Sequence, residues 1–588
     1  MTVTGALTTL TSTIYDECGL PTAESRFKQL DPDRILVTMP GIWPFWGGWA
    51  DPGGSSWPAA GSFDYDNVIR APYVDGLVLQ PPINEFAWSG GRWASLQVFA
   101  KYAHSHGKLF APIYEDYGVN DRLSVLDAFL YTAVSLGSGV GWTEGTDGDG
   151  MMIWSDVERA HAAHGWYLTQ HAPKVLPRRE RFAFIDSPFL ASLDYAGKGP
   201  DWAGYRAVDL AGMPEMMTDA GLEYDVLMPS DVQADAPRLE RYKAVGLVNT
   251  FRMTPDFVDA LATYRAKGGG LFIAGRSAAF DQYGRSRPEF LQQLLGLSKP
   301  PKEYALDAPA SWHFVEGIES GLLTSLVGAP GHQDAVYTIP VFDYEAEGYS
   351  VLATLDRHPD VAVVGCKDNV VFWFSKLGHQ FGPFTLDPEG LDFVMQFMRN
   401  LYGHFGVGYD KSNAVFLQSI DGNYKCLLTN NSNGYHDRIG FDVASFTDDL
   451  TGSFLVFNCT DMKPLVLDRP DPDGRVWANV DLEPNRPILI HIAQVTAEPA
   501  FVAGEWAVMD DAEWTSDKRR LRVKLDTALD TQPRVAFHLG SAKLKSITCD
   551  GAKVLQREID PVLGIVQIVL KPERPHLILD LRVGRAAS

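Results

Sequence analysis

The chain has 588 residues, enough for three or four domains that each bury a core of their own. Its formal net charge of −23 argues against nucleic acid or an anionic membrane surface as a partner, since both repel an acidic protein. No apolar run approaches the ~18 residues that a membrane-spanning helix needs, and residues 1–20 lack the features of a signal peptide.

The five cysteines are scattered and include no Cys-x-x-Cys pair. Free thiols of this kind are typical of a reducing compartment, so we expect a cytoplasmic protein. His104 and His106 lie near a predicted helix end, and His161 and His164 lie three apart on another predicted helix. Both spacings suit a metal, but neither pair has an evident third ligand. We therefore expect capping or solvated histidines, no metal site and no other cofactor.

Residues 1–177 alternate short apolar runs with amphipathic stretches, which is typical of a parallel sheet or barrel. We expect strands at 34–39, 76–80, 109–113, 138–142 and 151–154, and helices at 93–106, 122–136 and 155–171. A complete eight-fold barrel takes about 200 to 250 residues. Because this region is shorter, we predict a partial or reduced (β/α) barrel that a second polypeptide could complete.

A glutamate follows each of three successive predicted strands: Glu85 after 76–80, Glu115 after 109–113 and Glu144 after 138–142. The carboxyl ends of parallel strands meet on one side of a sheet or barrel, so we expect these side chains to share one cleft. A pair of carboxyl groups about 5–5.5 Å apart suits a retaining glycosidase, and a wider spacing suits an inverting one. We predict Glu115 as nucleophile, with Glu85 as acid/base. The alternatives are a helix-capping or surface role for Glu115 and a substrate-binding or structural role for Glu85.

Nine of the fifteen tryptophans lie between residues 43 and 166, several of them in predicted loops at strand ends. Sugars stack their C–H faces on indole rings and need carboxylate and amide partners for their hydroxyls. We therefore predict a carbohydrate-binding cleft. Its substrate-binding residues would be Glu144, Trp142, Asn84, Trp43, Trp46, Trp88, Asp116 and Tyr114. The alternative is that these tryptophans only pin a long loop to the barrel.

Residues 178–408 predict an open α/β domain with a doubly wound, flavodoxin-like sheet. We expect strands at 182–185, 224–227, 244–248, 271–274, 349–354, 361–364 and 370–375, and helices at 204–220, 254–267 and 388–401. No cysteine lies between Cys18 and Cys366, so the domain lacks the nucleophile of a glutamine amidotransferase. The glycines 268–270 precede a strand rather than follow one, which argues against a nucleotide-binding loop. We expect a structural or oligomerising role.

Residues 409–497 and 498–588 each predict a small antiparallel β-sandwich, because short apolar runs alternate with turn residues. We expect strands at 414–418, 424–428, 454–457, 488–492, 521–525, 535–539, 566–570 and 577–581. Packing or oligomer contact is the expected role, and a carbohydrate-binding module is the alternative. The predicted fold class is thus multidomain, α/β plus β.

This order of a βα region, a cysteine-free flavodoxin-like domain and a β-sandwich resembles glycoside hydrolase family 42, the β-galactosidases. The best-matching stretch is 205–297, where the runs 216–229, 241–245 and 264–274 are similar to the family's trimerisation domain. The resemblance extends over most of residues 75–495. It implies a clan A barrel that acts on a carbohydrate.

In that family the nucleophilic glutamate ends barrel strand seven, and the resemblance assigns this role to Glu115. The family commonly has Met-Glu there, where this chain has Tyr114-Glu115-Asp116. The acid/base of related barrels is the glutamate of an Asn-Glu pair, as in Asn84-Glu85. That pair lies only about one βα unit before Glu115. Either Glu85 has a different role, or the acid/base lies on a missing half-barrel.

The sequence therefore predicts a glycoside hydrolase, β-galactosidase-like and retaining by analogy, that acts on a small glycoside or oligosaccharide. We expect a homo-oligomer, a trimer by analogy. The alternative is a non-catalytic or incomplete carbohydrate-binding subunit, which would form a hetero-oligomer with a chain that completes the barrel.

Overall fold

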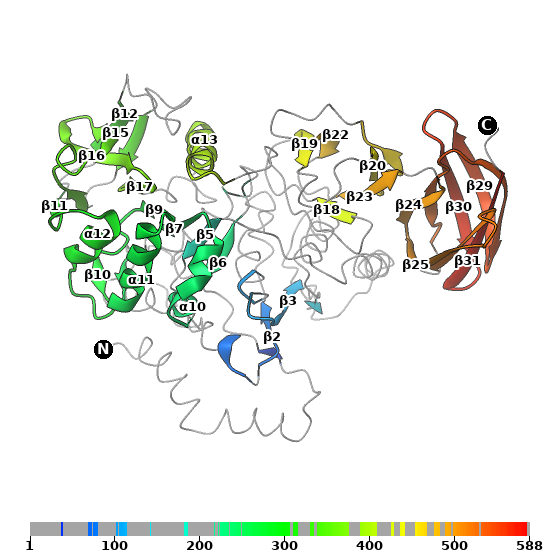
Figure 1. Ribbon diagram of the computed structural model, residues 1–588, viewed down its shortest axis with the longest axis horizontal. Coiled ribbons are helices and arrows are strands. Elements are labelled where there is room, and N and C mark those ends of the chain that lie inside the picture. Colours follow the sequence, from blue (N-terminus) through cyan, green and yellow to red (C-terminus); the bar gives the residue numbers. More distant parts are fainter. Residues whose placement is uncertain are drawn as a thin grey trace, which may run out of the picture. The chain divides into compact units, whose positions relative to one another are not determined.

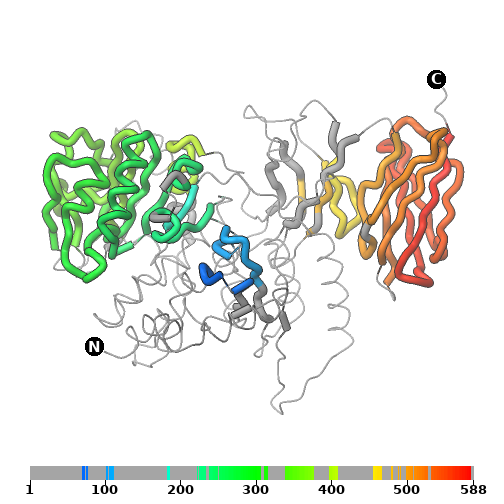
Figure 2. The backbone as a smooth tube through the Cα atoms, turned by 60° about the horizontal axis from the view of Figure 1, so that its bottom comes forward, coloured from blue at the N-terminus to red at the C-terminus, as the bar shows by residue number. Residues whose placement is uncertain are grey.

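The computed structural model describes residues 37–38, 69–72, 74–79, 101–103, 105–114, 141–142, 182–185, 217, 222, 224–234, 236–248, 250–305, 310–315, 330–333, 338–375, 388–407, 425–428, 436–441, 453–466, 476–482, 488–495, 498–527 and 531–584. The chain divides into two compact units (Figures 1 and 2). The first comprises Met1–Ile113 and Arg179–Tyr409, and the second comprises Tyr114–Arg178 and Asp410–Ser588. Within the described ranges, no helix has the length and apolar character needed to cross a membrane.

Three short parallel strands of the βα region lie where the sequence predicts them. They are β1 (Val37–Thr38), β2 (Gly76–Leu79) and β3 (Leu109–Tyr114). β1 pairs with β2, and β2 pairs with β3, each in parallel. A fourth predicted strand gives β4 (Gly141–Trp142). The predicted strand at 151–154 and the helices at 122–136 and 155–171 lie outside the described residues. The barrel itself therefore stays a prediction.

The largest element of the first unit is a nine-stranded mixed sheet of order β13-β12-β15-β16-β17-β9-β7-β5-β6. Its parallel part consists of β5 (Phe182–Ile185), β6 (Asp225–Leu227), β7 (Ala244–Val248), β9 (Gly270–Ala274) and β17 (Val370–Trp373). Counted in chain order, these five strands lie 2-1-3-4-5, which is the flavodoxin-like order. The sequence predicted each of these strands to within three residues.

The remaining strands of the sheet extend it in antiparallel fashion, which the sequence analysis did not predict. They are β12 (Ala310–Phe314), β13 (Pro330–Gln333), β15 (Ser350–Leu355) and β16 (His358–Lys367). Antiparallel β16 follows the β15 strand through a short turn, so no crossover helix is needed there. The domain is therefore a flavodoxin-like half-sheet with an antiparallel extension.

Helices and small sheets complete the first unit. The helices are α10 (Pro229–Ala234), the 3₁₀ helix η3 (Ala236–Arg241), α11 (Pro255–Ala266), α12 (Pro288–Leu295) and α13 (Pro388–His404). Two further parallel strands, β8 (Arg252–Met253) and β10 (Phe280–Asp281), pair with each other, as do the antiparallel strands β11 (Lys302–Ala305) and β14 (Thr338–Val341). All four of these α-helices begin with proline at the first helical position, where its missing N–H costs nothing.

The core of the first unit explains the glycine run after α11. Gly268 has a φ of +97°, the backbone conformation that ends a helix most easily with glycine. A Cβ on Gly269 would lie 2.2 Å from the ring of Tyr264, and a Cβ on Gly270 would lie 2.6 Å from Phe405. The three glycines thus serve helix termination and close packing.

Hydrogen bonds link the segments at the carboxyl ends of β5 and β7, the two strands between which the strand order reverses. In flavodoxin-like folds, ligands bind in the crevice at this point. Here the Thr250 hydroxyl donates to Ile185 O at 3.4 Å, and Thr250 N–H donates to Ser277 Oγ at 3.1 Å. Ser277 Oγ in turn donates to Ala274 O at 2.7 Å. Thr250 and Ser277 are 4% and 3% exposed, so internal partners fill this end of the sheet.

The second unit contains two antiparallel β-regions. The first consists of β18 (Lys425–Leu428), β19 (His436–Phe441), β20 (Ser453–Asn458), β21 (Lys463–Pro464), β22 (Val476–Leu482) and β23 (Ile488–Val495). β18-β23-β20-β21 form one sheet, and β19 pairs with β22. The predicted strand at 414–418 lies outside the described residues.

The C-terminal region is a sandwich of two four-stranded antiparallel sheets, drawn in orange and red in Figure 1. One sheet has the order β24-β27-β30-β29 and the other β25-β26-β31-β28. The strands are β24 (Ala500–Glu505), β25 (Ala507–Trp514), β26 (Arg520–Thr527), β27 (Arg534–His538), β28 (Lys543–Asp550), β29 (Ala552–Asp560), β30 (Ile565–Pro572) and β31 (His576–Gly584). Buried side chains of both sheets, among them Val523, Phe537, Ile568 and Leu579, form one core. The predicted strands of this sandwich are all present.

Candidate functional site

Most residues of the predicted carbohydrate site lie outside the described residues: Trp43, Trp46, Asn84, Glu85, Trp88, Glu115, Asp116 and Glu144. Tyr114 ends β3 and Trp142 ends β4, and only their backbone is described. The roles of all ten residues therefore stay predictions. The structure does describe two of the strands from which they follow.

Strands β2 and β3 are neighbours in parallel register, with Gly76 beside Leu109 and Leu79 beside Pro112. Both strands therefore end on the same side of the sheet. Neighbouring strands lie about 4.8 Å apart, so segments that leave adjacent strand ends start close together. A Cβ on Gly76 would lie 2.7 Å from the Cβ and the backbone oxygen of Leu109, so β2 needs a glycine there to approach β3.

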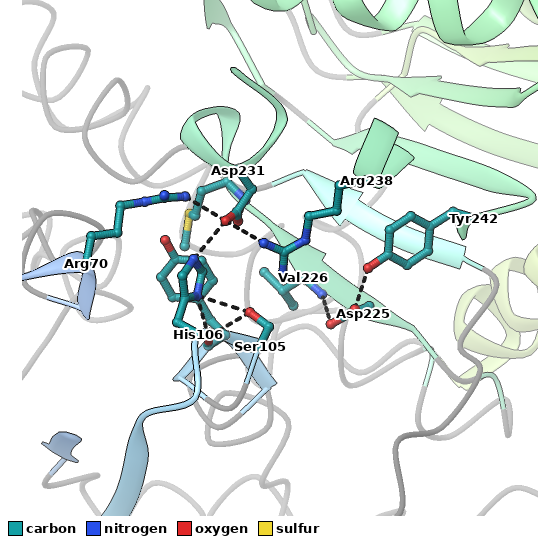
Figure 3. A network of polar contacts seen from close by, with 10 residues as sticks. Arg70, Ser105, His106, Asp225, Val226, Asp231, Arg238 and Tyr242 are labelled. Carbon is teal, nitrogen blue, oxygen red and sulfur yellow. Dashed lines mark hydrogen bonds and ion pairs between the residues drawn. The ribbon is translucent and has the colours of Figure 1, made fainter. Parts of the chain in front are cut away.

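Behind the amino ends of these strands lies a buried carboxylate that the sequence analysis did not single out. Asp231, on the short helix α10, is 1% exposed. Its Oδ1 accepts hydrogen bonds from Arg70 at 2.6 Å, His106 at 2.7 Å and Arg238 at 2.9 Å (Figure 3). Its Oδ2 accepts one from the Met228 N–H at 2.9 Å. We call Arg70, His106, Asp231 and Arg238 the Asp231 cluster.

Burial is the largest influence on the Asp231 carboxyl and would by itself raise its pKa. The hydrogen bonds from His106 and from Met228 N–H, together with the positive charge of Arg238, outweigh it and hold the pKa below its usual value. Asp231 is therefore ionised in the folded protein at neutral pH. A buried ion held by several donors in this way is costly to leave unpaired.

Both ring nitrogens of His106 have hydrogen-bond partners. Its Nδ1 lies 2.9 Å from Tyr102 O, one helical turn earlier, and 3.1 Å from Ser105 Oγ. Its Nε2 lies 2.7 Å from Asp231 Oδ1. His106 therefore caps the end of the helical segment that precedes β3 and contacts the carboxylate of Asp231. For His106 the expectation of a capping or solvated histidine is met by a capping role, and its side chain is 12% exposed. The other three histidines of these pairs lie outside the described residues.

Two lysines add to the contacts at the amino ends of β2 and β3. Lys108 directly precedes β3, and its ammonium donates to Ala71 O at 3.1 Å and Val74 O at 2.5 Å, in the segment that leads into β2. Lys101 donates to Tyr224 O and lies 4.7 Å from the centre of the Tyr224 ring, a cation–π distance. Tyr224 precedes β6 of the flavodoxin-like sheet.

The Asp231 cluster therefore joins the βα region to the flavodoxin-like domain within the first unit. Arg70 and His106 lie 161 and 125 residues from Asp231 in sequence, and no local pattern relates them. The local signal is limited to an aspartate on one short helix and an arginine on the next, seven residues later, which is common on protein surfaces. The cluster's position at the amino ends of β2 and β3, and its complete internal pairing, indicate a structural role.

Within the described ranges, no group of three or more histidine, cysteine, aspartate or glutamate side chains is arranged to hold a metal ion. The cysteines at 366, 459 and 549 are free thiols. Burial raises the pKa of Cys549 to about 11, and it also raises the pKa of Cys366. Thiols of this kind are poor nucleophiles at neutral pH, so neither residue suits covalent catalysis.

No protein-family model and no curated protein sequence matches this chain. Several solved structures do. A β-galactosidase from Bacillus circulans sp. alkalophilus superposes with a TM-score of 0.55 at 14% identity, over 81% of this chain and 66% of its own. A family 42 (GH42) β-galactosidase from G. stearothermophilus gives 0.54 at 12% identity, over 80% and 65%. A cold-adapted β-galactosidase from Rahnella sp. R3 gives 0.51 at 14% identity, over 74% and 62%.

The alignments span less than two thirds of the length of each of these β-galactosidases, and identities this low carry information about fold alone. The similarity covers most of the present chain, so it includes more than the flavodoxin-like sheet. In fold, the chain is therefore similar to the GH42 β-galactosidases, as the order of its elements predicted.

Proposed function

We propose that this protein is a glycosidase, β-galactosidase-like and retaining, with Glu115 as nucleophile and Glu85 as acid/base. The observation that carries the proposal is the parallel pairing of β2 with β3 in a chain whose fold is similar to GH42 β-galactosidases. Segments that leave neighbouring strands start about 4.8 Å apart, so the two glutamates follow from adjacent strand ends. Retaining enzymes need their two carboxyl groups about 5–5.5 Å apart.

In this proposal the chain has a barrel-like catalytic domain at 1–177, a flavodoxin-like trimerisation-type domain at 178–408 and β-sandwiches at 409–497 and 498–588. Glu144, Asn84, Asp116, Tyr114 and the tryptophans at 43, 46, 88 and 142 contact the sugar. The substrate is a small glycoside or oligosaccharide, and the protein acts in the cytoplasm as a homo-oligomer, trimeric by analogy.

The test is a panel of nitrophenyl glycosides, hydrolysed by the purified chain alone and by two variants. Glu115→Gln should abolish turnover, because the amide cannot form the glycosyl-enzyme intermediate. Glu85→Gln should lower kcat/KM by about 10²–10⁴-fold for a substrate with a poor leaving group. The same variant should lower kcat/KM less for a nitrophenyl glycoside, since nitrophenolate leaves with little help from an acid.

A matched control is Glu240→Gln, which removes an exposed carboxylate that pairs with exposed Lys267. It should leave the kinetics unchanged, and circular dichroism should show all three variants folded. Full activity in Glu115→Gln would rule out this nucleophile.

A second candidate is an incomplete subunit that binds sugar and needs another chain for catalysis. The observation that favours it is length, because the GH42 β-galactosidases extend well beyond the part that this chain matches. A chain that is inert alone, and that gains activity with a protein co-purified from its native source, supports this candidate. Hydrolysis by a pure homo-oligomer supports the first.

A further inference from the structure

Exposed apolar side chains gather at one place on the C-terminal sandwich. Among the described residues, eight large hydrophobic side chains are exposed, and five of these lie within residues 554–563. The five are Val554, Leu555, Ile559, Val562 and Leu563, with exposed fractions of 38, 50, 45, 90 and 41%. We call these five residues the β29 patch. Apolar clusters of this kind on a folded surface mark sites of association.

The strand that carries the patch is an edge strand. β29 is the last strand of its sheet and pairs with β30 on one side. Within the described part of the chain no strand pairs with its other side, so backbone N–H and C=O groups face outward along its length. Natural edges are often protected by lysines and bulges. Here Lys553 and a bulge between Val554 and Gln556 occupy the first half, and the second half pairs regularly with β30.

Two exposed side chains of β29, Val554 and Ile559, belong to the core-facing side of the sandwich, and Arg557, opposite Ile568, lies on the same side. In the pairing with β30, Val554 lies opposite Leu570 and Ile559 lies opposite Val566. Opposed residues of antiparallel strands lie on the same face of the sheet. Leu570 and Val566 are fully buried in the core of the sandwich. The inner face of this sheet therefore continues onto β29 without being covered there.

The tip of the β29–β30 hairpin is held in place by its own hydrogen bonds. Asp560 Oδ1 accepts from Val562 N–H at 2.8 Å and from Leu563 N–H at 3.0 Å, an aspartate turn. The turn fixes the backbone that presents Val562, the most exposed residue of the patch. The patch is thus a formed surface, and its ordering needs no partner.

The charges on β29 identify the partner that fits. Its first half carries Lys553, which lies 3.6 Å from exposed Glu573. Arg557 follows near the middle of the strand, and the second half carries Glu558 and Asp560. An antiparallel copy of the strand brings the basic beginning of one chain to the acidic end of the other. We propose that β29 pairs antiparallel with β29 of a second copy of this chain, which joins two sandwiches through a continuous sheet.

This pairing gives partners to the outward-facing backbone groups of β29 and covers its exposed apolar side chains. Backbone groups of the two strands bond to each other, and the exposed inner-face side chains Val554 and Ile559 of the two copies come to lie side by side. A two-fold axis relates the copies, so the interface closes on itself and does not propagate into a fibre. The inference does not depend on the proposed glycosidase activity.

The first test measures mass by sedimentation and light scattering of the full chain over a range of concentrations. Leu555→Lys combined with Ile559→Lys should halve the mass of the largest species, whether the flavodoxin-like domain oligomerises or not. The matched control is Val466→Lys, which changes an exposed valine elsewhere in the same unit and should leave the mass unchanged. An equal mass for the wild type and the double variant would overturn the proposal.

The second test keeps the apolar residues and looks for the two-fold axis. Single cysteines are placed at 555, 556, 557, 558 and 559, with Lys543→Cys on the exposed edge strand β28 as control. A disulfide needs a Cα–Cα distance of about 4.4–6.8 Å. Only residues next to the two-fold axis lie this close to their own copy, because a residue four positions from the axis lies over 10 Å from its copy. Oxidation should give a covalent dimer that peaks at one position of this series. No cross-link, or equal cross-linking at all positions and at residue 543, would also overturn the proposal.

Discussion

His106 Nε2 lies 2.7 Å from Asp231 Oδ1, and this contact joins the helix end before β3 to the helix α10 of the flavodoxin-like domain. Arg70 reaches the same oxygen from the segment before β2. One buried carboxylate thus fixes the amino ends of the two strands whose carboxyl ends lead to the predicted catalytic glutamates. We therefore expect the cluster to stabilise the two strands that lead to the proposed site.

Removal of the Asp231 charge should therefore destabilise the protein strongly. In Asp231→Asn, Arg70 and Arg238 are left partly buried without their counter-ion, which costs about 3–5 kcal/mol. The measurement is urea unfolding followed by circular dichroism. Glu240→Gln, which breaks an exposed pair with Lys267, should change the free energy of unfolding by about 1 kcal/mol or less. Similar values for both variants would contradict a stabilising role for the cluster.

The contribution of Asp231 should depend on pH in a defined direction. The pKa of Asp231 is lowered in the folded protein, so the unfolded chain binds a proton at higher pH than the folded one. Its stabilising effect is fully present above the unfolded pKa of about 3.9 and is lost as the pH falls through the lower folded pKa. The difference in unfolding free energy between the wild type and Asp231→Asn should stay level down to about pH 5 and shrink below about pH 4. A difference that grows on acidification would contradict this assignment.

Ser277→Ala should destabilise the edge of the sheet where the strand order reverses. The hydroxyl of Ser277 accepts from Thr250 N–H and donates to Ala274 O, and both neighbours are buried. Its removal deprives two buried backbone groups of this partner, which costs about 1–3 kcal/mol. Thermal unfolding measures the loss. Ser311→Ala, at an exposed position of β12, is the control and should change stability by less than about 0.5 kcal/mol.

Two glycine-to-alanine changes in the same unit should have opposite signs. A Cβ on Gly270 would lie 2.6 Å from Phe405 and 2.9 Å from Ala244 Cβ, so alanine overpacks the core at a cost of about 1–3 kcal/mol. A Cβ on Gly403 in α13 meets nothing within 4 Å. Alanine there should stabilise the helix by up to about 1 kcal/mol. Urea midpoints of the two variants check both signs, and a stable Gly270→Ala protein would refute the tight packing at β9.

The sequence predicted the strands well because their signals are local. Apolar runs bounded by glycine, proline or polar residues marked β2, β3, β5, β7 and β9, and each starts and ends close to its predicted range. In the antiparallel extension, β15 and β16 were predicted as strands, whereas β12 and β13 were missed because they are short and mixed in polarity. For the proposed site, the sequence located the strands β2 and β3 from whose ends Glu85 and Glu115 follow.

Local pattern alone thus determined where most strands lie, that the chain combines α/β and β regions, and that its fold resembles the GH42 β-galactosidases. Only the tertiary structure decided that Asp231 is a buried anion with partners up to 161 residues away, and that the inner face of β29 is left uncovered. The physical reason is that periodicity reports which residues prefer burial. The partner of a buried charge, and the strand that ends a sheet, depend on contacts between segments that are distant in the sequence.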